Sequence, residues 1–83
     1  MRIRLSQHAR EQSEERGASE QEVLRAVREG LREPVRAGRI LCRLNTDFAA
    51  EWQDRYYAVK QVAPIIVEED EEAVVVTVYT FYF

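Results

Sequence analysis

The chain has 83 residues, and its 12 basic and 15 acidic side chains give a formal net charge of −3. This length fits one small domain (residues 1–83), and the composition is that of a folded protein, not of a disordered segment. No apolar run approaches the roughly 18 residues of a membrane span, and the basic N-terminus lacks the apolar core of a signal peptide. We therefore expect a cytoplasmic protein that does not insert into a membrane.

One cysteine, Cys42, excludes an internal disulfide, and we expect it to be a buried apolar side chain in a reducing compartment. Because the chain has a single histidine and no metal-ligand spacing, we expect no metal site and no cofactor. Residues 1–43 hold ten arginines against seven acids, whereas residues 44–83 hold eight acids against two basic side chains. The first part of the chain would accordingly tolerate phosphate groups, and the acidic run at residues 68–72 would repel them.

The N-terminal part of the chain predicts a first helix. Residues 2–5 alternate Arg-Ile-Arg-Leu, as in a short strand or an extended lead-in. Ser6 is then placed to cap a helix over residues 7–16, and Gly17 can take the left-handed conformation that ends it. This helix has few apolar residues, so we expect it to be mostly solvated.

A second helix over residues 20–31 follows at once. Ser19 and Glu22 form a capping box, in which the hydroxyl and the carboxylate satisfy free backbone amides of the first turn. Four apolar residues then recur at helical spacing: Val23, Leu24, Val27 and Leu31. This stripe indicates that the second helix packs on the sheet, and Pro34 requires the helix to end before it.

The C-terminal part predicts strands. Residues 35–44 have the character of a strand with a bend or bulge at Gly38, while residues 45–54 are typical of a loop or a short helical turn. A long β-hairpin then occupies residues 55–83, with the acidic run at its tip. Pro64 cannot donate a ladder hydrogen bond, so it predicts a bulge or an edge position.

The second arm of this hairpin, residues 73–83, carries no charged residue. Strict alternation predicts two sets of side chains: Val74, Val76, Val78 and Tyr82 on one face, and Val75, Tyr79, Phe81 and Phe83 on the other. Both sets are apolar, so we expect an interior strand that is covered on both faces. The predicted fold is α+β, with two N-terminal helices packed on an antiparallel sheet of three or four strands.

Two side chains of the first helix are candidates for chemistry. His8 ionises near neutral pH and is suited to general acid or base catalysis, although a partly exposed helix residue is the plainer interpretation. Arg16 can bind a phosphate through two hydrogen bonds, or can instead compensate the helix dipole. The two residues are eight positions apart, so they could flank one substrate without touching each other.

Lys60, Thr77 and Tyr79 are the candidates in the hairpin. With a two-residue loop at 69–70, Lys60 lies opposite Tyr79 and diagonal to Thr77, and with an odd loop it lies opposite Thr80. A lysine beside hydroxyl groups can stabilise a phosphate or an oxyanion. Alternatively, the lysine extends to the rim of the sheet and the threonines only fit a strand.

The N-terminal run resembles the opening of a small bacterial family, domain of unknown function 4258. The residues that carry the likeness are Ser6, His8, Ala9, Arg16, Gly17, Ser19, Glu22 and Val23. The likeness is clearest over residues 5–24 and weaker over the hairpin. This family is similar to the RelE/BrnT toxin group, small α+β proteins that often cleave RNA. The resemblance implies that the characteristic histidine and arginine of the family fall on His8 and Arg16.

Two hypotheses for function follow. The first is a toxin-like domain with a cognate antitoxin as partner, either a metal-free endoribonuclease or a derivative that binds RNA. In it His8 would act as acid or base, Arg16 and Lys60 would stabilise the phosphate, and Thr77 or Tyr79 would orient it. The second hypothesis is a non-catalytic domain whose aromatic hairpin recognises a protein.

A homodimer built on the sheet is also predicted. Two helices cover about one face, and an uncovered apolar face would be larger than soluble monomers usually tolerate. A second copy would form a two-fold interface rich in Tyr and Phe. The alternative is cover from within the chain, by Phe48 and Trp52.

Overall fold

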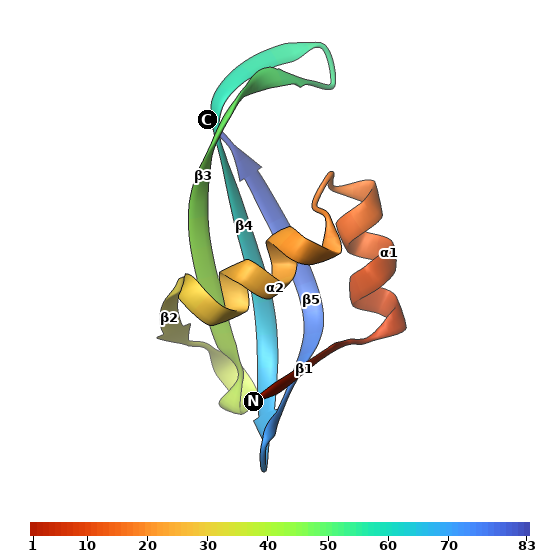
Figure 1. The fold of residues 1–83 in the computed structure, drawn as a ribbon, viewed down its shortest axis with the longest axis vertical. Coiled ribbons are helices and arrows are strands. Elements are labelled where there is room, and N and C mark those ends of the chain that lie inside the picture. Colours follow the sequence, from red (N-terminus) through yellow and green to blue (C-terminus); the bar gives the residue numbers. More distant parts are fainter.

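The computed structural model describes all residues, 1–83. Its elements in chain order are β1 (Arg2–Leu5), α1 (Gln7–Glu15), α2 (Glu20–Glu29), β2 (Leu31–Pro34), the short turn η1 (Arg36–Gly38), β3 (Ile40–Trp52), β4 (Arg55–Glu69) and β5 (Glu72–Tyr82). The strands form one sheet in the order β1-β5-β4-β3-β2. In Figure 1, α2 lies across the sheet and α1 lies beside β5.

The predicted α+β class with two N-terminal helices is confirmed, but the sheet differs from the prediction. It has five strands, and it is mixed because β1 runs parallel to β5 while the other pairs are antiparallel. Residues 45–54 are neither a loop nor a helical turn, since β3 continues to Trp52 and the chain reverses at residues 53–54. No helix is long and apolar enough to cross a membrane.

Both helices begin at the predicted caps. The Ser6 hydroxyl accepts a hydrogen bond from the Ala9 amide at 3.1 Å, and Ser19 and Glu22 form the capping box, with distances of 3.1 and 2.9 Å. The first helix ends before Gly17, as predicted, and this glycine has φ +78°.

The second helix ends two residues earlier than predicted. A Cβ at Gly30 would lie 2.5 Å from the Ala26 oxygen and 2.7 Å from the Arg43 oxygen, so only glycine allows β3 to approach the end of α2. The chain then turns directly into β2. Leu31 consequently pairs with Arg43 and is 82% exposed, so its predicted place in the apolar stripe is wrong.

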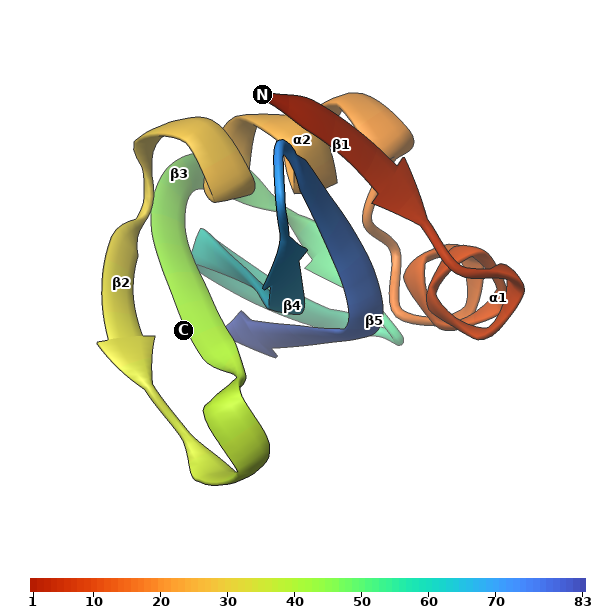
Figure 2. The same cartoon turned by 90° about the horizontal axis from the view of Figure 1, so that it is seen from below.

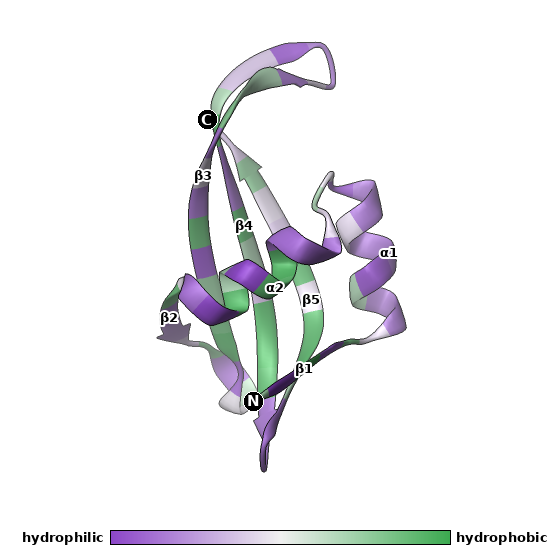
Figure 3. Cartoon of the chain, in the orientation of Figure 1, coloured by the Kyte–Doolittle hydropathy of each residue, from purple (hydrophilic) through white to green (hydrophobic).

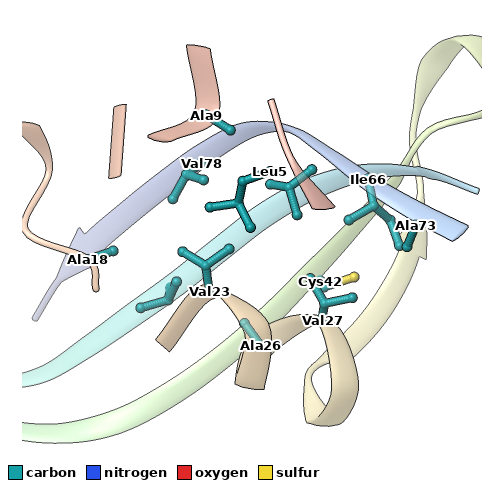
Figure 4. Close-up of a cluster of buried hydrophobic side chains, with 12 residues drawn as sticks. Leu5, Ala9, Ala18, Val23, Ala26, Val27, Cys42, Ile66, Ala73 and Val78 are labelled. Carbon is teal, nitrogen blue, oxygen red and sulfur yellow. The ribbon is translucent and has the colours of Figure 1, made fainter. Parts of the chain in front are cut away.

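The core lies between α2 and the sheet (Figure 4). Val23, Ala26 and Val27 of α2 are buried against strand residues such as Val62 and Ile66. Cys42 is buried in the same cluster, and burial raises the pKa of its thiol. Figure 3 shows apolar stretches of the strands beneath α2 and polar residues on its outer surface. Cover of one face by one apolar helix stripe is therefore confirmed.

The hairpin of β4 and β5 contains a bulge that changes which residues share a face. Ile65 pairs with Thr77 but Ile66 pairs with Val75, so Val76 has no partner. Val75 and Val78 consequently both lie in the buried cluster. The predicted alternation puts these two residues on opposite faces, so it is wrong across the bulge, although it holds on each side of it.

Pro64 affects the sheet in a different way from the prediction. It is buried on the central strand β4 and pairs with Val78, so it is at neither a bulge nor an edge. The ladder between β3 and β4 is interrupted next to it, since no pair lies between Leu41–Ile65 and Leu44–Val62. The missing proline N–H accounts for this gap.

The strand β5 is interior only at its beginning. Its neighbour β1 pairs with residues 72–75, and beyond them α1 takes the place of a strand. The Gln12 side chain accepts from the Val78 amide at 2.9 Å, and Arg16 donates to the Val78 oxygen at 2.7 Å. These two side chains form hydrogen bonds with the N–H and C=O groups of Val78, which has no neighbouring strand on this side.

Beyond the helices, residues 44–62 of β3 and β4 form an arm that curls over the turn between α1 and α2 (Figure 1). Gln53 and Asp54 at its tip have φ of 51° and 68°, as a tight hairpin turn requires. Trp52 stacks on Tyr82 with ring centroids 5.1 Å apart, and Phe48 meets Tyr82 edge-on at 5.3 Å. Cover by Phe48 and Trp52 thus exists, but on the Tyr82 side of the sheet.

Candidate functional site

The predicted phosphate-binding lysine is a buried structural residue. The Lys60 ammonium donates to the Gly17 oxygen at 2.7 Å and to Glu22 Oε1 at 2.9 Å, and its side chain is 7% exposed. It pairs across the hairpin with Tyr82, so neither predicted register is correct. The hairpin turns at Asp70 and Glu71, and not at residues 69–70. The unpaired Val76 then shifts the pairing of β4 with β5 by one further residue.

Lys60 belongs to a group of side chains that hold the turn between the helices. The Arg16 carbonyl accepts from the Thr80 hydroxyl at 2.9 Å and from the Tyr82 hydroxyl at 2.7 Å. Burial acts to raise the pKa of Glu22, but hydrogen bonds from Ser19 and Lys60 and the lysine charge outweigh it, so that this pKa is lowered. Burial raises the pKa of the Tyr82 phenol. No buried side-chain nitrogen or oxygen lacks a hydrogen-bond partner, so the buried polar atoms of this cluster are used by the fold itself.

Most of the motif residues from 5–24 have a structural role. Ala9 and Val23 are core residues, and Arg16 donates a hydrogen bond to a backbone oxygen at the edge of β5. A Cβ at Gly17 would lie 2.6 Å from the Trp52 ring and 2.7 Å from the Tyr82 oxygen. His8 is the exception, because it is exposed on α1 and its side chain forms no hydrogen bond or ion pair.

The side of the sheet opposite α2, here called the open face, carries a pair of exposed aromatic rings. Tyr79 and Phe81 are each 41% exposed, and their ring centroids are 6.3 Å apart with planes inclined by 25°. They point away from the core because they alternate with Val78 and Thr80 on the covered side. Ala63 lies opposite Tyr79 and is fully buried beneath the larger side chains.

An arginine accompanies each ring of this pair. The Arg16 guanidinium lies 5.2 Å from the Tyr79 centroid, and that of Arg43 lies 5.9 Å from the Phe81 centroid. Arg43 is held by Gln61 at 2.9 Å and by Glu33 at 3.1 Å. Cations beside aromatic faces are attracted to them electrostatically. Arg16 forms no ion pair and adds positive charge to this flat apolar surface, whereas the charge of Arg43 is paired with Glu33.

The structure thus divides the five candidate residues of the sequence into three groups. Thr77 and Tyr79 point to the open face, and Arg16 reaches that face from the end of α1. Lys60 lies on the covered side, and His8 lies on α1 away from any partner.

Three residues of this group on the open face, Phe81, Arg43 and Gln61, were not among the predicted site residues. Arg43 could not be placed there from the sequence, because the strand beside its own was unknown. The amide of Gln61 donates to Asn45 at 2.7 Å and supports Arg43, and only the observed register brings these groups together. No group of three or more His, Cys, Asp or Glu side chains lies close enough to hold a metal ion.

The chain matches no protein-family model, no curated protein and no solved structure. The resemblance over residues 5–24 therefore stays a prediction.

Proposed function

We propose that the chain is an RNA-binding derivative of the RelE/BrnT-like toxin group and that it binds single-stranded RNA on the open face. The observation that carries this proposal is the exposed pair Tyr79 and Phe81, with the guanidinium groups of Arg16 and Arg43 beside the rings. Sheet proteins that bind single strands use the same combination of stacking rings and cations.

The two rings supply the sequence-independent part of the affinity. Each base stacked on an aromatic side chain contributes about 1–3 kcal/mol, and every base offers a flat face. Arg16 and Arg43 are already held by the protein, at 2.7 Å to the Val78 oxygen and 2.9 Å to Gln61, so little freedom is lost when RNA binds.

Binding is better supported than cleavage. Lys60 lies on the covered side of the sheet in an ion pair with Glu22, so it cannot stabilise a phosphate on the open face. The catalytic hypothesis then rests on His8, which is exposed. Incubation of wild type and His8→Ala with labelled RNA tests it: cleavage by the wild type alone supports catalysis, and intact RNA in both removes that role. A cognate antitoxin remains a proposed partner.

Fluorescence polarisation with a labelled single-stranded RNA tests the binding proposal. We expect Tyr79→Ala/Phe81→Ala to weaken binding about tenfold or more, because two stacking surfaces are lost. Tyr56→Ala is the matched control, since Tyr56 is 66% exposed on the arm. Equal affinities of wild type and double variant would contradict the proposal.

A non-catalytic homodimer is the second candidate function. The observation in its favour is a row of exposed aromatic residues at the C-terminal end of the chain: Phe83, directly after β5, is 63% exposed and continues the alternation of Tyr79 and Phe81. Light scattering over a range of protein concentrations tests it. A dimer that Phe81→Glu dissociates supports this candidate, and a monomer at all concentrations contradicts it.

A further inference from the structure

The hairpin that joins β2 to β3 carries two arginines without partners. All nine residues from Leu31 to Arg39 are exposed. Arg32 forms an ion pair with Glu68, and Arg43 pairs with Glu33, whereas Arg36 and Arg39 form none. Their charges are therefore available to an external group.

The backbone of the hairpin presents these two side chains at the ends of one tight turn. The Val35 amide donates to the Arg39 oxygen at 2.9 Å, and the Arg39 amide donates to the Arg36 oxygen at 3.3 Å. Ala37 and Gly38 between them have φ of 62° and 69°. The turn is thus closed by its own hydrogen bonds and holds the two arginines near each other.

The turn lies beside the open face. In the view along the long axis, the end of the hairpin extends from the sheet on the side away from α2, and the acidic turn between β4 and β5 lies on the α2 side (Figure 2). At the base of the same hairpin, Leu31 pairs with Arg43, whose guanidinium lies over Phe81. The turn η1 lies at the same end of the sheet as the acidic run, because Ile40 pairs with Ile66 and Arg32 forms an ion pair with Glu68, but the two turns extend to opposite sides. Arg36 and Arg39 therefore add unpaired positive charge on the side of the open face.

We infer that Arg36 and Arg39 bind backbone phosphates of the RNA strand whose bases stack on Tyr79 and Phe81. This inference rests on the proposed function and adds the path of the strand, from β5 across β4 and β3 to the turn η1. Arginine suits phosphate because its planar group donates two parallel hydrogen bonds to it. Contacts of this kind position a strand without reading its sequence.

The dependence of RNA affinity on salt concentration tests the inference. For single strands, the slope of log K against log salt is about −0.7 for each phosphate contacted. Loss of two contacts in Arg36→Ala/Arg39→Ala should therefore make the slope shallower by about 1.4. Arg25→Ala/Arg28→Ala is the control, because it removes the same charge from the exposed surface of α2 on the other side of the sheet.

The outcomes separate the inference from the proposal on which it rests. A shallower slope for the hairpin variant alone supports both. A slope equal to that of the wild type overturns the inference, and the proposed function then stands if Tyr79→Ala/Phe81→Ala still weakens binding. Wild type that binds polyglutamate more tightly than RNA, through Arg36 and Arg39, overturns the inference in favour of an acidic protein partner. Wild type that binds no RNA overturns both.

Discussion

The two faces of the sheet treat the same kinds of side chain in opposite ways. On the covered face, Lys60, Thr80 and Tyr82 all donate hydrogen bonds to the turn between the helices, and Tyr82 is surrounded by aromatic rings. On the open face, Tyr79 and Phe81 stay 41% exposed beside two arginines. The contacts of the side chains on the covered face stabilise the fold. The exposed rings on the open face have no such role, so we propose that the open face is the functional one.

The strongest test of the covered face is Gly17→Ala. Its new Cβ would lie within 2.8 Å of Trp52 and would have to keep φ +78°. We expect a loss of about 2–5 kcal/mol in the free energy of unfolding, from overpacking together with the left-handed backbone. Urea denaturation measures it. The control is Gly38→Ala, which has φ +69° and no atom within 4 Å, and should lose only about 1–2 kcal/mol.

Lys60→Met should have the next largest effect. The change leaves the Gly17 oxygen and the Glu22 carboxylate without their shared donor. Because the Glu22 side chain is 34% exposed, we expect a loss of about 1–3 kcal/mol, less than for a fully buried pair. The same change in a Glu22→Gln background should cost less. Equal costs in the two backgrounds would show that the pair is not coupled.

The lowered pKa of Glu22 predicts a smaller, pH-dependent effect. A carboxyl whose pKa is lower in the folded state stabilises the fold above its unfolded value of 4.5, and this contribution is lost as pH falls below that value. The stability difference between wild type and Glu22→Gln should therefore shrink between about pH 6 and pH 3. A difference that stays constant over this range would contradict the role of Glu22.

The smallest effect is expected at the tip of the arm, outside both faces. Asp54 has φ 68°, which glycine adopts without strain. We expect Asp54→Gly to stabilise the fold by about 0.5–1 kcal/mol, and Asp47→Gly, within the strand β3, to destabilise it. Thermal denaturation compares the two variants, and destabilisation by Asp54→Gly would mean that the turn has another conformation.

Local signals in the sequence predicted the helices well, because Ser6, Gly17 and the capping box act within one turn of chain. Residues 45–54 were misread because they begin with three consecutive polar residues, Asn-Thr-Asp, and show no strand alternation. The strand β3 is also irregular here, since Ala49 has φ 47° and the register shifts between Asp47 and Ala50. Tertiary contacts determine such an irregularity, so composition alone does not show it.

The candidate site was predicted only in part for a similar reason. Tyr79 and Arg16 were among the predicted residues, but the Val76 bulge decides that Lys60 lies opposite Tyr82 instead. A one-residue shift moves a side chain to the other face of a sheet. Nothing in the local sequence specifies the bulge, and the contact of Arg43 with Phe81 depends on the order of three strands.

The most direct test of RNA binding on the open face is an NMR titration of the wild-type chain with a short single-stranded RNA, following backbone amides. We predict chemical-shift changes from Tyr79 in β5 to Phe83 directly after it, at Arg43 and in η1. The amides of Arg25 and Arg28 on α2 should not change. Changes confined to the helices, or no changes at RNA concentrations well above that of the protein, would contradict this account.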